Sequence, residues 1–163
     1  MSETNTPTLL KRVPIFQDFT DSQIEKITNM TTSRALKQGE VLFLEGDPST
    51  EMLIVLEGVL QIQSGTGSEI ANVRSMGIVG EMGVLTDEPR SADVFCMEEA
   101  MGFQITKVDL INLFLSDGGI CRKILLNLVK TLSQKLYDTN AEIQKLRDEQ
   151  TREAPPKDDI FLY

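Results

Sequence analysis

One glycine-containing segment, residues 80–92, combines residue types that suit a charged, polar ligand. Glu81 offers a carboxylate that can accept hydrogen bonds from hydroxyl groups. Arg90 offers a planar fork of donors that suits a phosphate. A glycine, which has no side chain, lets the backbone approach a ligand closely. We expect one binding site here, whose candidate residues are Gly80, Glu81, Met82, Arg90, Ser91 and Ala92.

The composition argues against catalysis and against several kinds of partner. The chain has no histidine and 2 cysteines, Cys96 and Cys121, which do not form a metal-binding spacing. We therefore expect no metal, no haem or iron–sulfur cofactor and no enzyme activity. The net charge of −9 disfavours non-specific binding to DNA. No apolar run approaches the roughly 18 residues of a membrane span.

The 80–92 segment is expected to lie between β-strands. Short apolar stretches separated by turns extend from Lys37 to about Ile105, with one turn at residues 64–68. Residues 94–97 and 101–105 are expected to form a hairpin. Before the strands, Thr20 and Gln23 have the spacing of a capping box, which predicts a helix that begins there.

A long helix is expected from about Ile120 to Glu149, because this stretch has no Pro or Gly and helix formers dominate. Apolar residues recur in it at heptad spacing, interrupted by Thr139. Glu142 and Arg147 would face each other across a parallel pair of helices, which favours a homodimer. The alternative is that the helix packs only on its own domain. The predicted dimer seam comprises Leu125, Val129, Leu132, Leu136, Ile143 and Leu146.

These segments together resemble the cyclic nucleotide-binding domain, the family of catabolite activator protein and the regulatory subunit of protein kinase A. The resemblance covers roughly residues 10–148 and is densest in the 80–92 segment. It implies an α+β fold: an antiparallel, jelly-roll-like β-roll with an N-terminal helix and a long C-terminal helix. Further matching segments are residues 13–16, residues 37–47 as the first strands and turn, and residues 52–56 and 57–62 as the next pair of strands.

The resemblance also implies roles for the candidate residues. Glu81 would accept a hydrogen bond from the ribose 2′-hydroxyl, Arg90 would pair with the cyclic phosphate, and backbone N–H groups nearby would complete an anion nest. On the long helix of one branch of the family, a Thr-Ser pair reads adenine. Thr139 keeps the threonine here and Asn140 replaces the serine, so both are candidates for base contact. The implied ligand is cAMP, with cGMP possible.

We expect a disordered lead over residues 1–8, the binding domain with its dimerisation helix over 9–149, and a flexible tail over 150–163. The apolar ending at residues 160–163 is either an ordinary chain terminus or a docking peptide or lid over the site. The resemblance implies a non-enzymatic cyclic nucleotide receptor that acts on an unidentified downstream protein. From the polar N-terminus, the lack of a long apolar run and the acidic net charge, we expect it in the cytoplasm, without a membrane or DNA partner. A stand-alone domain is expected, because too few residues follow Glu149 for a DNA-binding domain. The alternative is a dimerisation or scaffold module in which the same fold has lost its ligand.

Overall fold

The computed structural model describes residues 6–153, which fall into two compact units. The first unit ends at Asn127 and contains every strand described, and the second begins at Leu128. The last helix, α5 (Gly118–Glu153), contributes residues to both units. The candidate binding segment therefore belongs to the first unit, and most of the predicted dimer seam belongs to the second.

Three short helices begin the first unit: α1 (Thr6–Leu10), the 3₁₀ helix η1 (Pro14–Phe16) and α2 (Asp21–Thr28). Helix α1 begins at Thr6, within the expected lead over residues 1–8, and residues 1–5 lie outside the described chain. The predicted capping box is confirmed, since the Thr20 side chain accepts a hydrogen bond from the Gln23 backbone and Gln23 returns one. Apolar residues of all three helices are buried, which fixes them to the domain.

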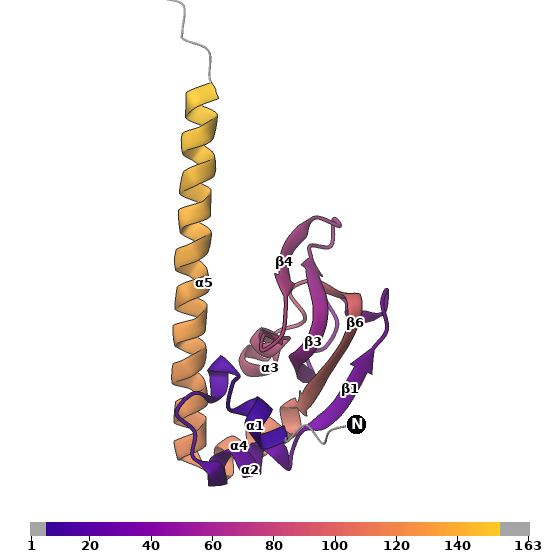
Figure 1. The fold of residues 1–163 in the computed structure, drawn as a ribbon, viewed down its shortest axis with the longest axis vertical. Coiled ribbons are helices and arrows are strands. Elements are labelled where there is room, and N and C mark those ends of the chain that lie inside the picture. Colours follow the sequence, from indigo (N-terminus) through magenta and orange to yellow (C-terminus); the bar gives the residue numbers. More distant parts are fainter. Residues whose placement is uncertain (1–5, 154–163) are drawn as a thin grey trace, which may run out of the picture. The chain divides into compact units, whose positions relative to one another are not determined.

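The predicted antiparallel β-roll with flanking helices is confirmed (Figure 1). Its central path runs β1–β6–β3–β4, while β2 pairs with β6 and β5 pairs with β3. All of these pairs are antiparallel. The strands are β1 (Thr32–Leu36), β2 (Val41–Phe43), β3 (Glu51–Gln63), β4 (Glu69–Val73), β5 (Ile78–Val79) and β6 (Asp93–Thr106).

Two strand predictions are wrong in the same way. Residues 52–56 and 57–62, expected as a pair of strands, form the single strand β3, and the expected hairpin over 94–105 is the single strand β6. The two strands pair along their length, and register shifts between Val55 and Leu60 let the ladder continue. Gly58, at φ 88°, permits this close pairing, because a Cβ there would lie 2.4 Å from the Glu99 carbonyl oxygen.

The core of the roll is formed by inward-facing apolar residues of the paired strands. Its members are Leu36, Phe43, Leu53, Val55, Leu60, Val79, Val94, Cys96 and Ala100. Alternate residues of a strand point to opposite faces, so the roll encloses one set and leaves the other toward solvent. This core holds β5 and β6 in place, and these two strands bound the 80–92 segment.

After β6 the chain becomes helical, in α4 (Lys107–Ser116) and then α5. The start of α5 is fastened to the N-terminal region by Asn127, whose side-chain amide donates to the carbonyl oxygens of Ile15 at 3.0 Å and Gln17 at 2.9 Å. Helix α5 continues to Glu153, into the expected tail over residues 150–163, and residues 154–163 lie outside the described chain. Among the helices described, none combines the length and apolar character needed to cross a bilayer.

Candidate functional site

The 80–92 segment begins with a sharp turn at Gly80, directly after β5. Gly80 has φ 83°, a left-handed conformation that costs little only for glycine. It also has no room for a side chain, because a Cβ would lie 2.6 Å from Nη1 of Arg90 and 2.7 Å from the Phe43 ring. The turn leads into the short helix α3 (Glu81–Thr86). Glycine is thus required here for both conformation and packing.

Arg90 lies at the other end of the segment and is held there by its backbone and its side chain. Its N–H donates to the Asp47 carbonyl at 2.8 Å, and its own carbonyl accepts from the Gly46 N–H at 2.9 Å. Its Nη1 donates to the Gly80 carbonyl oxygen at 3.2 Å. The structure therefore brings together the two ends of the segment, Gly80 and Arg90, as a binding site would require.

The Arg90 side chain is a buried cation, with 6% of the residue exposed. Burial lowers the pKa of its guanidinium, while the nearby carboxylates of Glu51 and Asp47 act in the opposite direction. In the described part of the chain, no carboxylate comes close enough to Arg90 for an ion pair, and its Nε is buried without a hydrogen-bond partner. Buried charges and donors are normally paired, so this arrangement suits an anionic ligand.

The remaining predicted residues of the segment differ in exposure. Glu81 is 8% exposed at the start of α3, and Ala92 is 9% exposed just before β6. Met82 and Ser91 are exposed. Glu81 and Arg90 are thus buried polar residues of one continuous segment, whereas Met82 and Ser91 can contribute through exposed surface or through their backbone groups.

The predicted base-contact residues belong to the other unit. Thr139 and Asn140 are exposed residues of α5, beyond Leu128. Their contact with a base stays a prediction. The seam residues from Val129 to Leu146 share this part of α5, and their role in a dimer also stays a prediction.

A pocket of about 380 Å³ opens beside Arg90. Its acidic members, Asp47 and Glu51, would repel an anion that approached Arg90 from this side. Glu81, Ser91 and Ala92 do not line it, so we do not assign it to the phosphate. The lining residues are Leu42, Phe43, Asp47, Pro48, Thr50, Glu51 and Arg90.

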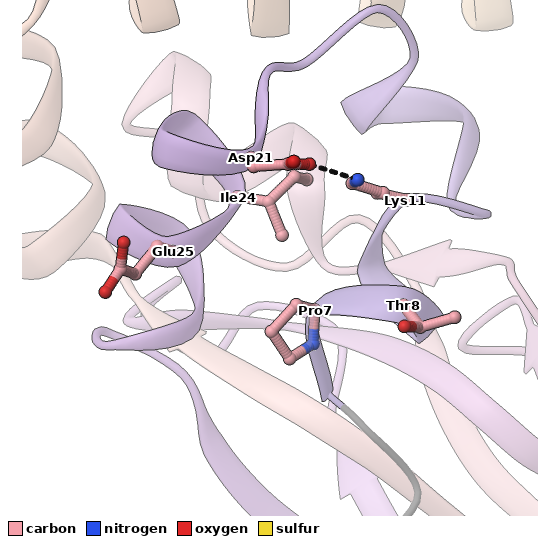
Figure 2. Close-up of a pocket in the computed structure, with 6 residues that line it drawn as sticks. All are labelled: Pro7, Thr8, Lys11, Asp21, Ile24 and Glu25. Carbon is pink, nitrogen blue, oxygen red and sulfur yellow. Dashed lines mark hydrogen bonds and ion pairs between the residues drawn. The ribbon is translucent and has the colours of Figure 1, made fainter.

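A second pocket, of about 410 Å³, lies at the N-terminal helices (Figure 2). Figure 2 shows the ion pair between Lys11 and Asp21 at its side, with Glu25 and Ile24 on α2. Lys11 forms an ion pair with Asp21, whereas Arg90 is buried without an ion-pair partner in the described chain. No predicted site residue lines it, and we assign no function to it.

Sequence reasoning missed two residues that pack against the 80–92 segment. Phe43 lies beneath the guanidinium, with the Arg90 Cζ 3.5 Å from the ring centroid. Ser49 is buried against α3, since a Cβ on Gly83 would lie 1.9 Å from the Ser49 hydroxyl oxygen. Phe43 reads in the sequence as one more apolar strand residue and Ser49 as a turn residue. Neither carries a local signal of its contact, which depends on the folded chain.

Three features of this unit together define a class of ligand-binding domain. They are the antiparallel β-roll, the glycine turn into a short helix, and the arginine buried near that turn. The family model for the cyclic nucleotide-binding domain matches residues 33–117, which is more than half of the chain. The chain therefore belongs to the cyclic nucleotide-binding domain family, as the resemblance in its sequence implied.

Similar proteins agree with this assignment. The chain is 30% identical over 118 residues to a candidate potassium channel protein of Rhodopseudomonas palustris, covering 71% of this chain and 29% of that protein. It is 30% identical over 91 residues to the cAMP-dependent protein kinase regulatory subunit of Neurospora crassa, covering 55% of this chain and 24% of that protein. The chain thus spans less than a third of either relative.

The fold also matches that of a solved domain. A cyclic nucleotide-binding domain from Methylobacillus flagellatus superposes with a TM-score of 0.76 and 22% sequence identity, covering 86% of this chain and 81% of the other. At this identity the match supports the fold and carries no statement about the ligand.

Proposed function

We propose that this chain binds a cyclic mononucleotide through its 80–92 segment and acts as a receptor rather than an enzyme. The observation that carries the proposal is the Arg90 guanidinium, which is buried, has no ion-pair partner in the described chain and holds a buried Nε without a hydrogen bond. A cyclic phosphate carries one negative charge and can accept hydrogen bonds in the plane of the guanidinium. Family membership points to the same class of ligand.

The other residues of the segment would recognise the rest of the nucleotide. In this proposal Glu81 accepts a hydrogen bond from the ribose 2′-hydroxyl, and backbone N–H groups near Gly80, Met82, Ser91 and Ala92 complete the anion site. Thr139 and Asn140 remain the candidates for contact with the base. We favour cAMP over cGMP, which is consistent with the cAMP-dependent regulatory subunit among the relatives.

The proposed receptor would signal through α5 as a homodimer. A ligand shifts a conformational equilibrium only by the difference in its affinity for the two states. Leu132, Leu136 and Leu146 are large apolar side chains that are exposed on α5, which supports a second copy as their partner. A cytoplasmic location and an unidentified downstream protein belong to the same proposal. Both cysteines are free thiols, as a reducing compartment favours.

The exposed seam also favours a second candidate function. The chain could dimerise through α5 as a scaffold, with a binding segment that has lost its ligand. In that case variants of the seam would abolish function, and variants of Arg90 would not.

Calorimetric titration of ligand-stripped protein with cAMP and with cGMP tests the proposal. We expect saturable binding at one site per chain, tighter for cAMP. Arg90→Ala should weaken binding about 10- to 100-fold, because charge-assisted hydrogen bonds contribute roughly 1.5–3 kcal/mol. Arg74→Ala, which removes an exposed arginine near the segment, should bind as the wild type does. A folded, empty wild-type protein that binds neither nucleotide would favour the scaffold.

A further inference from the structure

An aromatic ring, and not a carboxylate, lies against the face of the buried Arg90 guanidinium. The Arg90 Cζ lies 3.5 Å from the centroid of Phe43, and both residues are 6% exposed. Gly80 packs against the same pair, because a Cβ there would be 2.6 Å from Nη1 and 2.7 Å from Cε2 of the ring. The guanidinium is therefore held by a ring on its face and by the Gly80 carbonyl at one N–H.

This arrangement restrains the guanidinium without using up its donors. Stacking on an aromatic face attracts a cation by about 0.5–2 kcal/mol, more when the pair is desolvated. The attraction acts on the face of the group, whereas its N–H donors lie in the plane. A carboxylate in the same place would instead occupy those donors and neutralise the charge, so an anionic ligand would have to displace it.

The restraint also reduces the entropy that binding must remove. An arginine side chain has about 2 kcal/mol of rotamer entropy, part of which is lost when a ligand fixes it. If the ring already fixes the plane, the free protein has lost part of that entropy before the ligand arrives. The longer-range effect of Glu51 and Asp47 helps to keep the buried group charged without taking its donors.

We propose that Phe43 is a positioning residue for anion recognition, one that fixes the plane of the Arg90 guanidinium before the ligand binds. This inference rests on the proposed function, because it assigns Arg90 to the phosphate. Phe43 also belongs to the apolar core of the roll. Leucine could fill that core position but offers no aromatic face. Substitution by leucine therefore distinguishes the core packing of Phe43 from its stacking on Arg90.

The test compares Phe43→Leu, which removes the ring, with Phe43→Tyr, which keeps it. Phe103→Leu is the matched control, since it removes a core ring from β6 at 9% exposure. Two quantities are measured in the full chain: the dissociation constant for cAMP and the NMR chemical shift of the Arg90 Nε–Hε group. The shift reports the aromatic ring current directly and requires no ligand.

We expect the Arg90 Hε signal to be displaced by the ring current in the wild type and in Phe43→Tyr, and to lose that displacement in Phe43→Leu. Affinity for cAMP should fall about 3- to 30-fold in Phe43→Leu, which corresponds to most of the stacking range given above. Phe43→Tyr should restore most of it, and Phe103→Leu should leave it unchanged.

Three outcomes would overturn the proposal. A wild-type Hε signal that Phe43→Leu does not move would show that the stack is absent in solution. A signal that moves while affinity stays at the wild-type value would leave Phe43 as a core residue only. An affinity loss of the same size in Phe103→Leu would assign the effect to general destabilisation.

Failure of the proposed function looks different. In that case wild-type protein would not bind cAMP, although its Hε signal would still show the stack. Inorganic phosphate then serves as the probe in the same comparison of Phe43→Leu, Phe43→Tyr and the wild type. If only Phe43→Leu binds phosphate more weakly than the wild type, Phe43 positions Arg90 for an anion other than a nucleotide. If all three proteins bind phosphate equally, or none binds it, the positioning role is overturned.

Discussion

The fit between Ser49 and Gly83 links the loop before β3 to helix α3. The Ser49 hydroxyl is buried without a hydrogen-bond partner in the described chain, a costly state for a polar group. It occupies the space that a side chain at position 83 would need. The Glu88 carbonyl oxygen would also lie only 2.6 Å from a Cβ on Gly83. Two backbone segments can therefore approach each other only because residue 83 is glycine. This contact fixes the helix that begins with Glu81.

We expect Gly83→Ala to lower the free energy of unfolding by about 1–3 kcal/mol, the usual cost of overpacking. The added methyl group collides with Ser49 and with the Glu88 carbonyl, and this outweighs the gain of up to about 1 kcal/mol that alanine brings to a helix. Adding Ser49→Gly should recover part of the loss, because the collision with Glu88 remains. Urea unfolding of the wild type, Gly83→Ala, Ser49→Gly and the double variant measures both effects.

A glycine in open space provides the control. Gly118 also lies in a helix, and a Cβ there would meet nothing within 4 Å. Gly118→Ala should be neutral or stabilising. If Gly83→Ala were as stable as the wild type, or if Ser49→Gly recovered nothing, the collision would not be the determinant of this contact.

At the scale of elements, Asp117 connects α2 to the junction between α4 and α5. Its carboxylate accepts a hydrogen bond from Lys26 of α2 at 2.6 Å and another from the Ile120 backbone N–H of α5 at 3.1 Å. These two hydrogen bonds hold the pKa of Asp117 below its ordinary value of 3.8, and the bond from Lys26 has the larger effect. The start of α5 is thereby tied to the N-terminal helices at Asp117 and again at Asn127.

The depressed pKa predicts a loss of stability in acid. A carboxylate whose pKa is lowered by folding stabilises the protein above its unfolded-state pKa, and this contribution disappears as the pH falls through the folded-state pKa. A double-mutant cycle of Asp117→Asn and Lys26→Met should give a favourable coupling at pH 7 that disappears as the pH falls through the lowered pKa of Asp117. The coupling should be small, since the pair is partly exposed. A coupling that persists in acid would contradict the assignment.

At the scale of the whole molecule, α5 has apolar side chains that the second unit by itself does not bury. Val129, Leu132, Leu136, Ile143 and Leu146 are between 41% and 63% exposed. Their heptad spacing would place them along one seam of a two-stranded coiled coil. A helix with such a stripe is stabilised chiefly when the stripe packs against a partner. The seam therefore supports the proposal of a homodimer.

Leu136→Asp should convert a dimer to a monomer, because it would place two carboxylates face to face in the seam. Ala141→Asp adds the same charge at an exposed helical position outside the seam and should leave the dimer intact. Light scattering coupled to size-exclusion chromatography measures the mass of each variant. A wild-type monomer at micromolar concentration, or a Leu136→Asp protein that remains dimeric, would refute the seam.

Local patterns in the sequence determined much of this architecture. The Thr20–Gln23 capping box, the turn at residues 64–68 and the helix-forming stretch after Ile120 depend on neighbouring residues, and the structure contains all three elements. The residue types of the 80–92 segment indicated the candidate site, and together with the other matching segments they indicated the family. Such signals are readable because backbone sterics, caps and turn chemistry act over a few residues.

Tertiary structure decided what depends on residues far apart in the chain. The bulged pairing of β3 with β6 made single strands where the sequence suggested two, because Gly58 allows the strands to approach closely. The burial of Arg90, its stacking on Phe43 and the fit of Ser49 to Gly83 likewise join distant segments. Packing of this kind depends on the positions of side chains in space, and no local pattern in the sequence records those positions.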